Sequence, residues 1–148
     1  MADTNRIPPF DANGNLPPGV HQVFLGDIEK RLTWTEKRKE LYQGFVKAVL
    51  NLESAGVLFL YIGGSFVTKE DEPDDIDGCW VPNANINVKL LDEIFYKDRE
   101  FPRTKMKQKY GVDFLIHGVD QGTDGKPIQG WFETDDDGND KGILLLKL

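Results

Sequence analysis

Six consecutive apolar residues, Val57 to Ile62, constrain the fold of this 148-residue chain more than any other feature. The run is short and ends at Gly63-Gly64, a pattern typical of a strand buried on both faces. The segment before it, Glu36 to about Ala55, carries apolar residues at helical spacing and predicts an amphipathic helix. A helix followed directly by a buried strand indicates a sheet that is covered by helices.

Local signals set the expected ends of this helix. Thr33-Trp34-Thr35-Glu36 has the form of a capping box, with Thr33 as the N-cap and Glu36 at the third helical position. Gly56 is a natural stop just beyond the C-terminus. Upstream, Val20 to Leu32 predicts a short element that includes a helix over Leu25–Leu32.

The other segments complete an alternating order of helices and strands. Residues 1–19 contain four prolines and predict an extended arm, whose Leu16-Pro17-Pro18-Gly19 can pack on the body. Residues 20–148 form the single predicted domain, of the α/β (α+β) class, with a mixed β-sheet backed by helices. Its further predicted parts are strands over Asp75–Val81, Val112–His117 and Ile143–Leu146, a helix capped by Asn85 or Asn87 that runs through Val88, Leu91, Ile94 and Phe95, a basic segment Phe101–Tyr110 closed by Gly111, and turns at residues 122–125 and 135–139.

Composition restricts the environment and the partners. The net charge of −7 opposes approach to a phosphate backbone, so general nucleic-acid binding is not expected. A single cysteine, Cys79, favours a reducing compartment, and we expect it to be a small buried thiol. The first residues lack the apolar core of a secretory signal, and no apolar run is long enough for a membrane span. We therefore expect a cytoplasmic protein with no membrane partner.

Three aspartates stand out on the predicted strands. Side chains alternate along a strand, so Asp75 and Asp77 point to one face while Ile76 enters the core. The same rule places Asp113 opposite its apolar neighbours in the third strand. Carboxylates that share a face repel one another unless a cation lies between them, and their oxygens suit Mg²⁺ or Mn²⁺. Asp113 beside the other two would complete a two-metal site.

Gly63-Gly64-Ser65 ends the first strand and has a matching role. Glycines allow the backbone to approach a phosphate closely, and the following N–H groups and the Ser65 hydroxyl can hold phosphate oxygens. Lys107 and Lys109 are candidates for binding the rest of a triphosphate. Phosphates held by this turn and metals held by the aspartates would then meet in one place.

Each of these features has a simpler interpretation when taken alone. Gly63-Gly64 can be only a turn, and Asp75 and Asp77 can be solvated members of an acidic stretch. Asp113 can be a charge at a strand edge, and the lysines can be a solvated helix face. His117 shares the face of Asp113 but is better explained as a surface or packing residue. The combination, at this spacing, favours the functional interpretation of the glycines and the aspartates.

The pattern GGSFVTKEDEPDDID, with VDF later in the chain, resembles the DNA polymerase β-type nucleotidyltransferase superfamily. It looks closest to minimal single-domain members found near toxin–antitoxin and defence systems. The resemblance covers residues 57–81 and 112–117. It implies that the active site lies at one edge of a mixed sheet.

The resemblance implies transfer of a nucleoside monophosphate from ATP or another nucleoside triphosphate to a hydroxyl on a protein, an RNA or a small molecule. In this scheme Asp75 and Asp77 bridge two metal ions, and Asp113 binds the ion on the acceptor side. The alternative is a binding module, such as an antitoxin or decoy, that keeps the fold without turnover.

Overall fold

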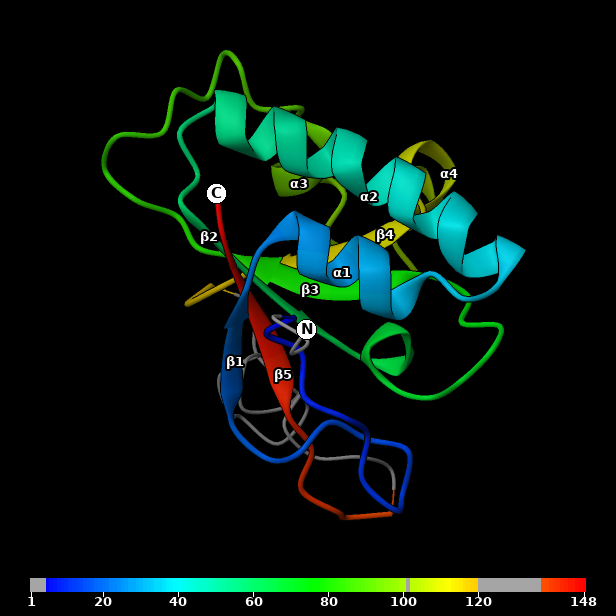
Figure 1. Ribbon diagram of the computed structural model, residues 1–148. Helices are drawn as coiled ribbons and strands as arrows, with labels where there is room; N and C mark the ends of the chain where they lie inside the picture. The colour runs from blue at the N-terminus through cyan, green and yellow to red at the C-terminus, as the bar shows by residue number, and fades with distance from the viewer. Residues whose placement is uncertain (1–4, 101, 120–136) are drawn as a thin grey trace.

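Five strands form one mixed sheet in the computed structural model, which describes residues 5–100, 102–119 and 137–148 (Figure 1). The strand order is β1-β5-β2-β3-β4, with parallel pairs at the two edges and antiparallel pairs in the middle. The α+β class with a mixed sheet, predicted from the sequence, is therefore confirmed. The strands are β1 (Val20–Val23), β2 (Phe59–Gly63), β3 (Ile76–Trp80), β4 (Val112–Ile116) and β5 (Ile143–Lys147).

The helices gather on one face of the strands β2, β3 and β4 (Figure 1). Alternate strand residues, among them Leu60, Ile76 and Phe114, point to that face and are almost fully buried. They join the apolar stripe of the longest helix in a single hydrophobic core. The helices are α1 (Leu25–Leu32), α2 (Glu36–Ser54), α3 (Ile94–Lys97) and α4 (Thr104–Tyr110), and a short 3-10 turn, η1, spans Ser65–Val67.

The predicted N-cap of α2 was wrong by two residues. Thr33 ends α1, because its hydroxyl donates back to the carbonyl of Glu29 within that helix. Thr35 takes the capping role instead and accepts a hydrogen bond from the backbone N–H of Arg38 at 3.2 Å. Two helices separated by three residues leave space for only one cap of this kind.

The C-terminus of α2 explains why the next strand begins later than its apolar run. Gly56 has a φ of 98°, and its N–H donates to Glu53 while the N–H of Val57 donates to Leu52. These two bonds form a Schellman motif, which uses Val57 to complete the helix end. The strand β2 accordingly starts at Phe59 and includes Gly63.

The predicted helix through Val88 and Leu91 is present only at its end, as α3. Local side-chain bonds explain the difference, because they hold the backbone in turns. Asn83, Asn87 and Asp92 each accept a hydrogen bond from the backbone N–H two residues ahead. Asn51 of α2 also binds the carbonyl of Leu90 and the N–H of Asp92. These bonds replace helical ones.

The described part of the predicted arm packs against the domain. Ile7 and Leu16 are 1% and 0% exposed, and both belong to the main core. Asn15 forms an isolated antiparallel bridge with Thr68, in the segment between β2 and β3. The arm therefore borders the loop that precedes the aspartates.

Arg38 of α2 is a fully buried cation that holds this same loop. Its guanidinium donates to the carbonyl groups of Leu32, Ser65, Phe66, Thr68 and Glu70. It also lies 3.7 Å from the centroid of the Trp34 ring. Burial lowers the pKa of Arg38 to about 10, so the side chain remains charged at neutral pH. One side chain thus fixes the path of residues 65–70.

Within the described residues, every helix is too short or too polar to cross a membrane. The predicted turn at residues 122–125 lies outside the described part of the chain, and the turn at 135–139 lies partly outside it.

Candidate metal centre

The aspartates lie on the sheet face that turns away from the helices. In the parallel pair β3–β4, Asp77 and Asp113 are direct register partners, and Gly63 of β2 is the partner of Asp77 on the other side. Ile76 is 0% exposed and points into the core, as the alternation rule predicts. Three adjacent strands thus bring the glycines and the aspartates to one place.

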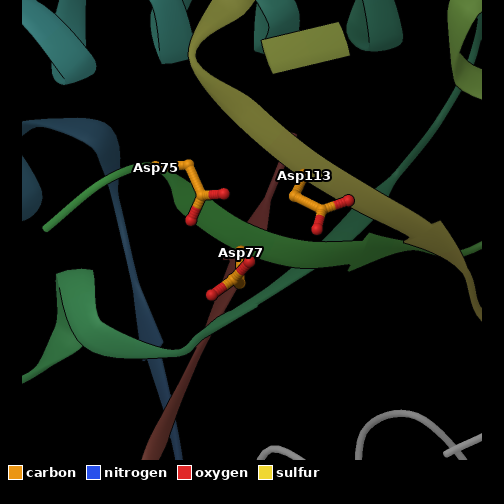
Figure 2. A group of neighbouring side chains, drawn as sticks. All are labelled: Asp75, Asp77 and Asp113. Carbon is orange, nitrogen blue, oxygen red and sulfur yellow. The ribbon is translucent and has the colours of Figure 1, made fainter. Parts of the chain in front are cut away.

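Asp75, Asp77 and Asp113 form a compact group of carboxylates (Figure 2). Each offers one oxygen atom, and these atoms all lie within 4.8 Å of one another. Asp75 and Asp113 are each 8% exposed, and Asp77 is partly buried. Asp74, the neighbour that the sequence predicts to point away, is exposed. Strand alternation and register therefore explain why these three carboxylates come together and why Asp74 does not join them.

The acidity of Asp77 reflects this crowding. Burial first, and then the negative charges of Asp75 and Asp113, together raise the pKa of its carboxyl group to about 7, while Lys107 opposes the rise. A hydrogen bond with the Asp75 side chain acts in the same direction as burial. Two carboxylates can share such a bond only when one of them carries a proton, so repulsion within the group is strong in the absence of a cation.

Gly64 brings the end of β2 directly against Asp77. Its φ of 73° and ψ of −163° belong to a region that side chains rarely adopt. A Cβ atom placed at Gly64 would collide with Oδ2 of Asp77 and lie 2.9 Å from its Cγ. The turn formed by Gly63, Gly64 and Ser65 therefore borders the carboxylates because residue 64 has no side chain.

The helix α4 supplies the positive charge of the site. Lys107 Nζ lies 3.0 Å from Oδ2 of Asp75. Arg103, at the start of the helix, binds both oxygens of Asp113, through Nε to Oδ1 and through Nη2 to Oδ2 at 3.2 Å. Met106 and Tyr110 on the same helix point into the core. The helix thus presents an apolar stripe to the core and a cationic stripe to the aspartates.

The other residues singled out in the sequence fall into different surroundings. Ser65 begins η1 and is partly buried, next to Gly64. Lys109 is not placed with Lys107: it binds Asp92 at 2.6 Å, because residues two apart on a helix point in different directions. His117 stacks on Tyr61 with the ring centroids 5.5 Å apart. Cys79 is fully buried, so the expectation of a small buried thiol is confirmed.

The sequence that carries this site matches a known protein family. A model described as a family of unknown function, DUF6932, matches residues 8–147. The chain belongs to the DUF6932 family. No curated protein and no solved structure matches it. The match of the DUF6932 model begins inside the predicted arm, so the family unit includes most of the arm as well as the sheet and the aspartates.

Arg103 is the residue of this DUF6932 site that the sequence did not single out. Its signal is its spacing from Lys107, because residues four apart lie on the same face of a helix. The pair stands just before the strand that carries Asp113, so a helix–turn–strand path brings it back to that aspartate. What the sequence lacks is the angle between α4 and β4, which decides whether the arginine reaches it.

Proposed function

We propose that this DUF6932 chain is a metal-dependent nucleotidyltransferase, which transfers a nucleoside monophosphate from a nucleoside triphosphate to a hydroxyl group and releases pyrophosphate. The observation that carries the proposal is the convergence of Asp75, Asp77 and Asp113 beside the turn at Gly64. Metal ligands and a close-approach backbone turn are the two parts that phosphoryl-group chemistry needs at one point.

The donor set supports a hard divalent cation. The three candidate ligands offer carboxylate oxygens, which Mg²⁺ and Mn²⁺ prefer to nitrogen or sulfur. Burial, and after it the charges of Asp75 and Asp113, raises the pKa of Asp77 despite the opposing charge of Lys107, and a bound cation would relieve the repulsion among the carboxylates. Asp75 and Asp77 would hold the ion, which when bound would neutralise charge on the phosphate oxygens.

The chain's own residues account for the rest of the substrate site. The backbone of Gly63-Gly64-Ser65 borders Asp77, so its N–H groups and the Ser65 hydroxyl are the candidates for holding phosphate oxygens. Lys107 adds a positive charge beside Asp75, and its side chain is 36% exposed, which leaves it accessible to an anionic ligand. The acceptor is a hydroxyl on a protein, an RNA or a small molecule.

A labelling experiment tests the proposal. The purified protein is incubated with each α-³²P-labelled nucleoside triphosphate, Mg²⁺ or Mn²⁺ and cell extract, and label is sought on protein, RNA and small molecules. We expect transfer that EDTA abolishes and that Asp77→Asn reduces by about a thousandfold or more. Asp74→Asn is the matched control, since it removes the same charge from an exposed neighbour and should retain activity. Full activity in folded Asp77→Asn protein would refute the mechanism.

One observation favours a second candidate function, that of a binding module. Asp113 is already held by Arg103, as expected of a carboxylate with a structural role. A module of this kind would bind a nucleotide or a protein partner without turnover. It would give no label in the same experiment, and its partner binding would survive Asp77→Asn.

A further inference from the structure

Arg103 and Asp113 form a buried, bidentate ion pair at the edge of the carboxylate group. Two guanidinium nitrogens donate to the two oxygens of one carboxylate, and both side chains are 10% exposed. A third nitrogen, Nη1, donates to the carbonyl of Arg99 at 3.2 Å, which fixes the guanidinium from its other side. The carbonyl group of Arg99 therefore helps to hold the guanidinium of Arg103 against Asp113.

Resting on the proposed function, we infer that the site takes one divalent cation, held by Asp75 and Asp77, and that the guanidinium of Arg103 replaces a second cation at Asp113. A bidentate pair occupies one in-plane lone pair on each oxygen, so a metal ion cannot be held by both oxygens from that side. Arginine does not release its proton at any physiological pH, so the positive charge stays in place.

Lys107 and Asp75 provide the contrast. Lys107 Nζ lies 3.0 Å from Oδ2 of Asp75, and the lysine side chain is 36% exposed against 10% for that of Arg103. An ammonium on a flexible, hydrated stem leaves a carboxylate more readily than a buried guanidinium fork does. Asp75 can therefore exchange its partner for a cation, whereas Asp113 keeps its own.

The charges near the three carboxylates also favour one bound divalent cation over two. When all three aspartates are ionised, Arg103 and Lys107 leave one negative charge in excess. One divalent cation turns this into a single positive charge, which suits a triphosphate. A second divalent cation would bring the excess to three positive charges in a partly buried place, which electrostatic repulsion opposes.

Counting bound Mn²⁺ tests the inference without reference to activity. Free and bound Mn²⁺ are separated by electron paramagnetic resonance during titration of the whole chain, with and without a non-hydrolysable nucleoside triphosphate. We expect one Mn²⁺ per chain beyond any bound to the nucleotide itself, and no spin coupling between two ions. Two ions per chain, or a coupled pair, would overturn the inference and leave the proposed function intact. No Mn²⁺ at all would overturn both.

Variants of the pair give a second, independent test. The double variant Arg103→Met with Asp113→Asn removes both charges, so the net charge of the site stays the same. We expect it to bind Mn²⁺ as tightly as the wild type, whereas Asp77→Asn should bind more than about tenfold more weakly. A loss of that size in the double variant would show that Asp113 is a ligand and overturn the inference. Arg103→Met alone, which exposes Asp113, should gain a second bound Mn²⁺. A folded Arg103→Met chain that still binds one ion would contradict the role given to the guanidinium, and a count of two would support it.

Discussion

Asp77 shows at the scale of one residue how a site can oppose the fold that carries it. The pKa of its carboxyl group is about 7, against an ordinary value of 3.8, first because of burial and then because of its two acidic neighbours. The folded chain consequently binds this proton more tightly than the unfolded chain does. Ionised Asp77 therefore lowers the free energy of unfolding when no cation is present.

The raised pKa predicts how stability depends on pH. Between about pH 4 and pH 7 the folded chain holds more protons at Asp77 than the unfolded chain, so the free energy of unfolding falls as pH rises. Asp77→Asn removes this dependence. The free energy of unfolding of the variant minus that of the wild type should therefore be larger at pH 8 than at pH 4, by roughly 2–4 kcal/mol. Urea unfolding in EDTA, at several pH values, measures the difference, with Asp74→Asn as the control. A difference between variant and wild type that does not change with pH would contradict the assignment.

Gly64 gives a second prediction at this scale, because its backbone and its surroundings both exclude a side chain. Gly64→Ala should lower the free energy of unfolding by about 3 kcal/mol, from backbone strain and from collision with the Asp77 carboxylate. Gly118→Ala is the matched control: its φ is 81°, but a Cβ there meets no atom within 4 Å, so only about 1 kcal/mol of strain is expected. Urea unfolding of the two variants separates strain from collision. Equal losses would show that the contact with Asp77 carries no weight.

At the scale of elements, Arg38 joins α2 to the loop that carries η1. Its five carbonyl partners come from the end of α1 and from residues 65–70, so a single side chain replaces the regular bonding that this loop lacks. The same loop leads from the glycine turn to Asp75. Fixing the loop therefore fixes both halves of the candidate site.

Arg38→Met should destabilise the chain by about 3–5 kcal/mol, because it removes the guanidinium that donates to carbonyl groups in the loop and at the end of α1, with the bonds to Leu32 and Phe66 fully buried. Lys39→Met, one residue along, should change the free energy of unfolding by less than about 0.5 kcal/mol, since the ion pair that Lys39 forms with Glu36 is exposed. Urea unfolding measures both, and hydrogen exchange should show faster exchange of the amides of residues 66–70 in the Arg38 variant alone. Unchanged exchange there would mean that the loop is held by other contacts.

The helices also show which local sequence signals are sufficient to predict where an element begins and ends. The periodicity of α2 and the glycine after it predicted that helix to within one residue, because propensity, amphipathicity and the terminal turn agree there. The choice between Thr33 and Thr35 failed because both are good caps, and only the end of α1 decides between them. Arg38 lies on the same stripe as Leu41 and Phe45, which is a visible signal of burial. Its partners in the loop, 27 to 32 residues away in the sequence, are not visible in this way.

For the molecule as a whole, the face and the membership of the aspartate group followed from strand alternation, which needs no tertiary information. Their approach needed the register of β3 against β4, and this depends on the path of α3 and α4 between the two strands. The sequence likewise placed Lys107 and Lys109 together in one role. The helix separates them, and it brings Arg103 to the site in place of Lys109.

The position of β5 between β1 and β2 sets an order of events during synthesis. The strands β2, β3 and β4, which carry the glycine turn and all three aspartates, leave the ribosome before residues 143–147 do. On the nascent chain one edge of β2 is then unpaired, and β1 is not yet paired with β5. Unpaired strand edges of this kind can pair with other chains. The part of the sheet that carries the candidate site is thus made before β5, the strand that pairs with the edge of β2.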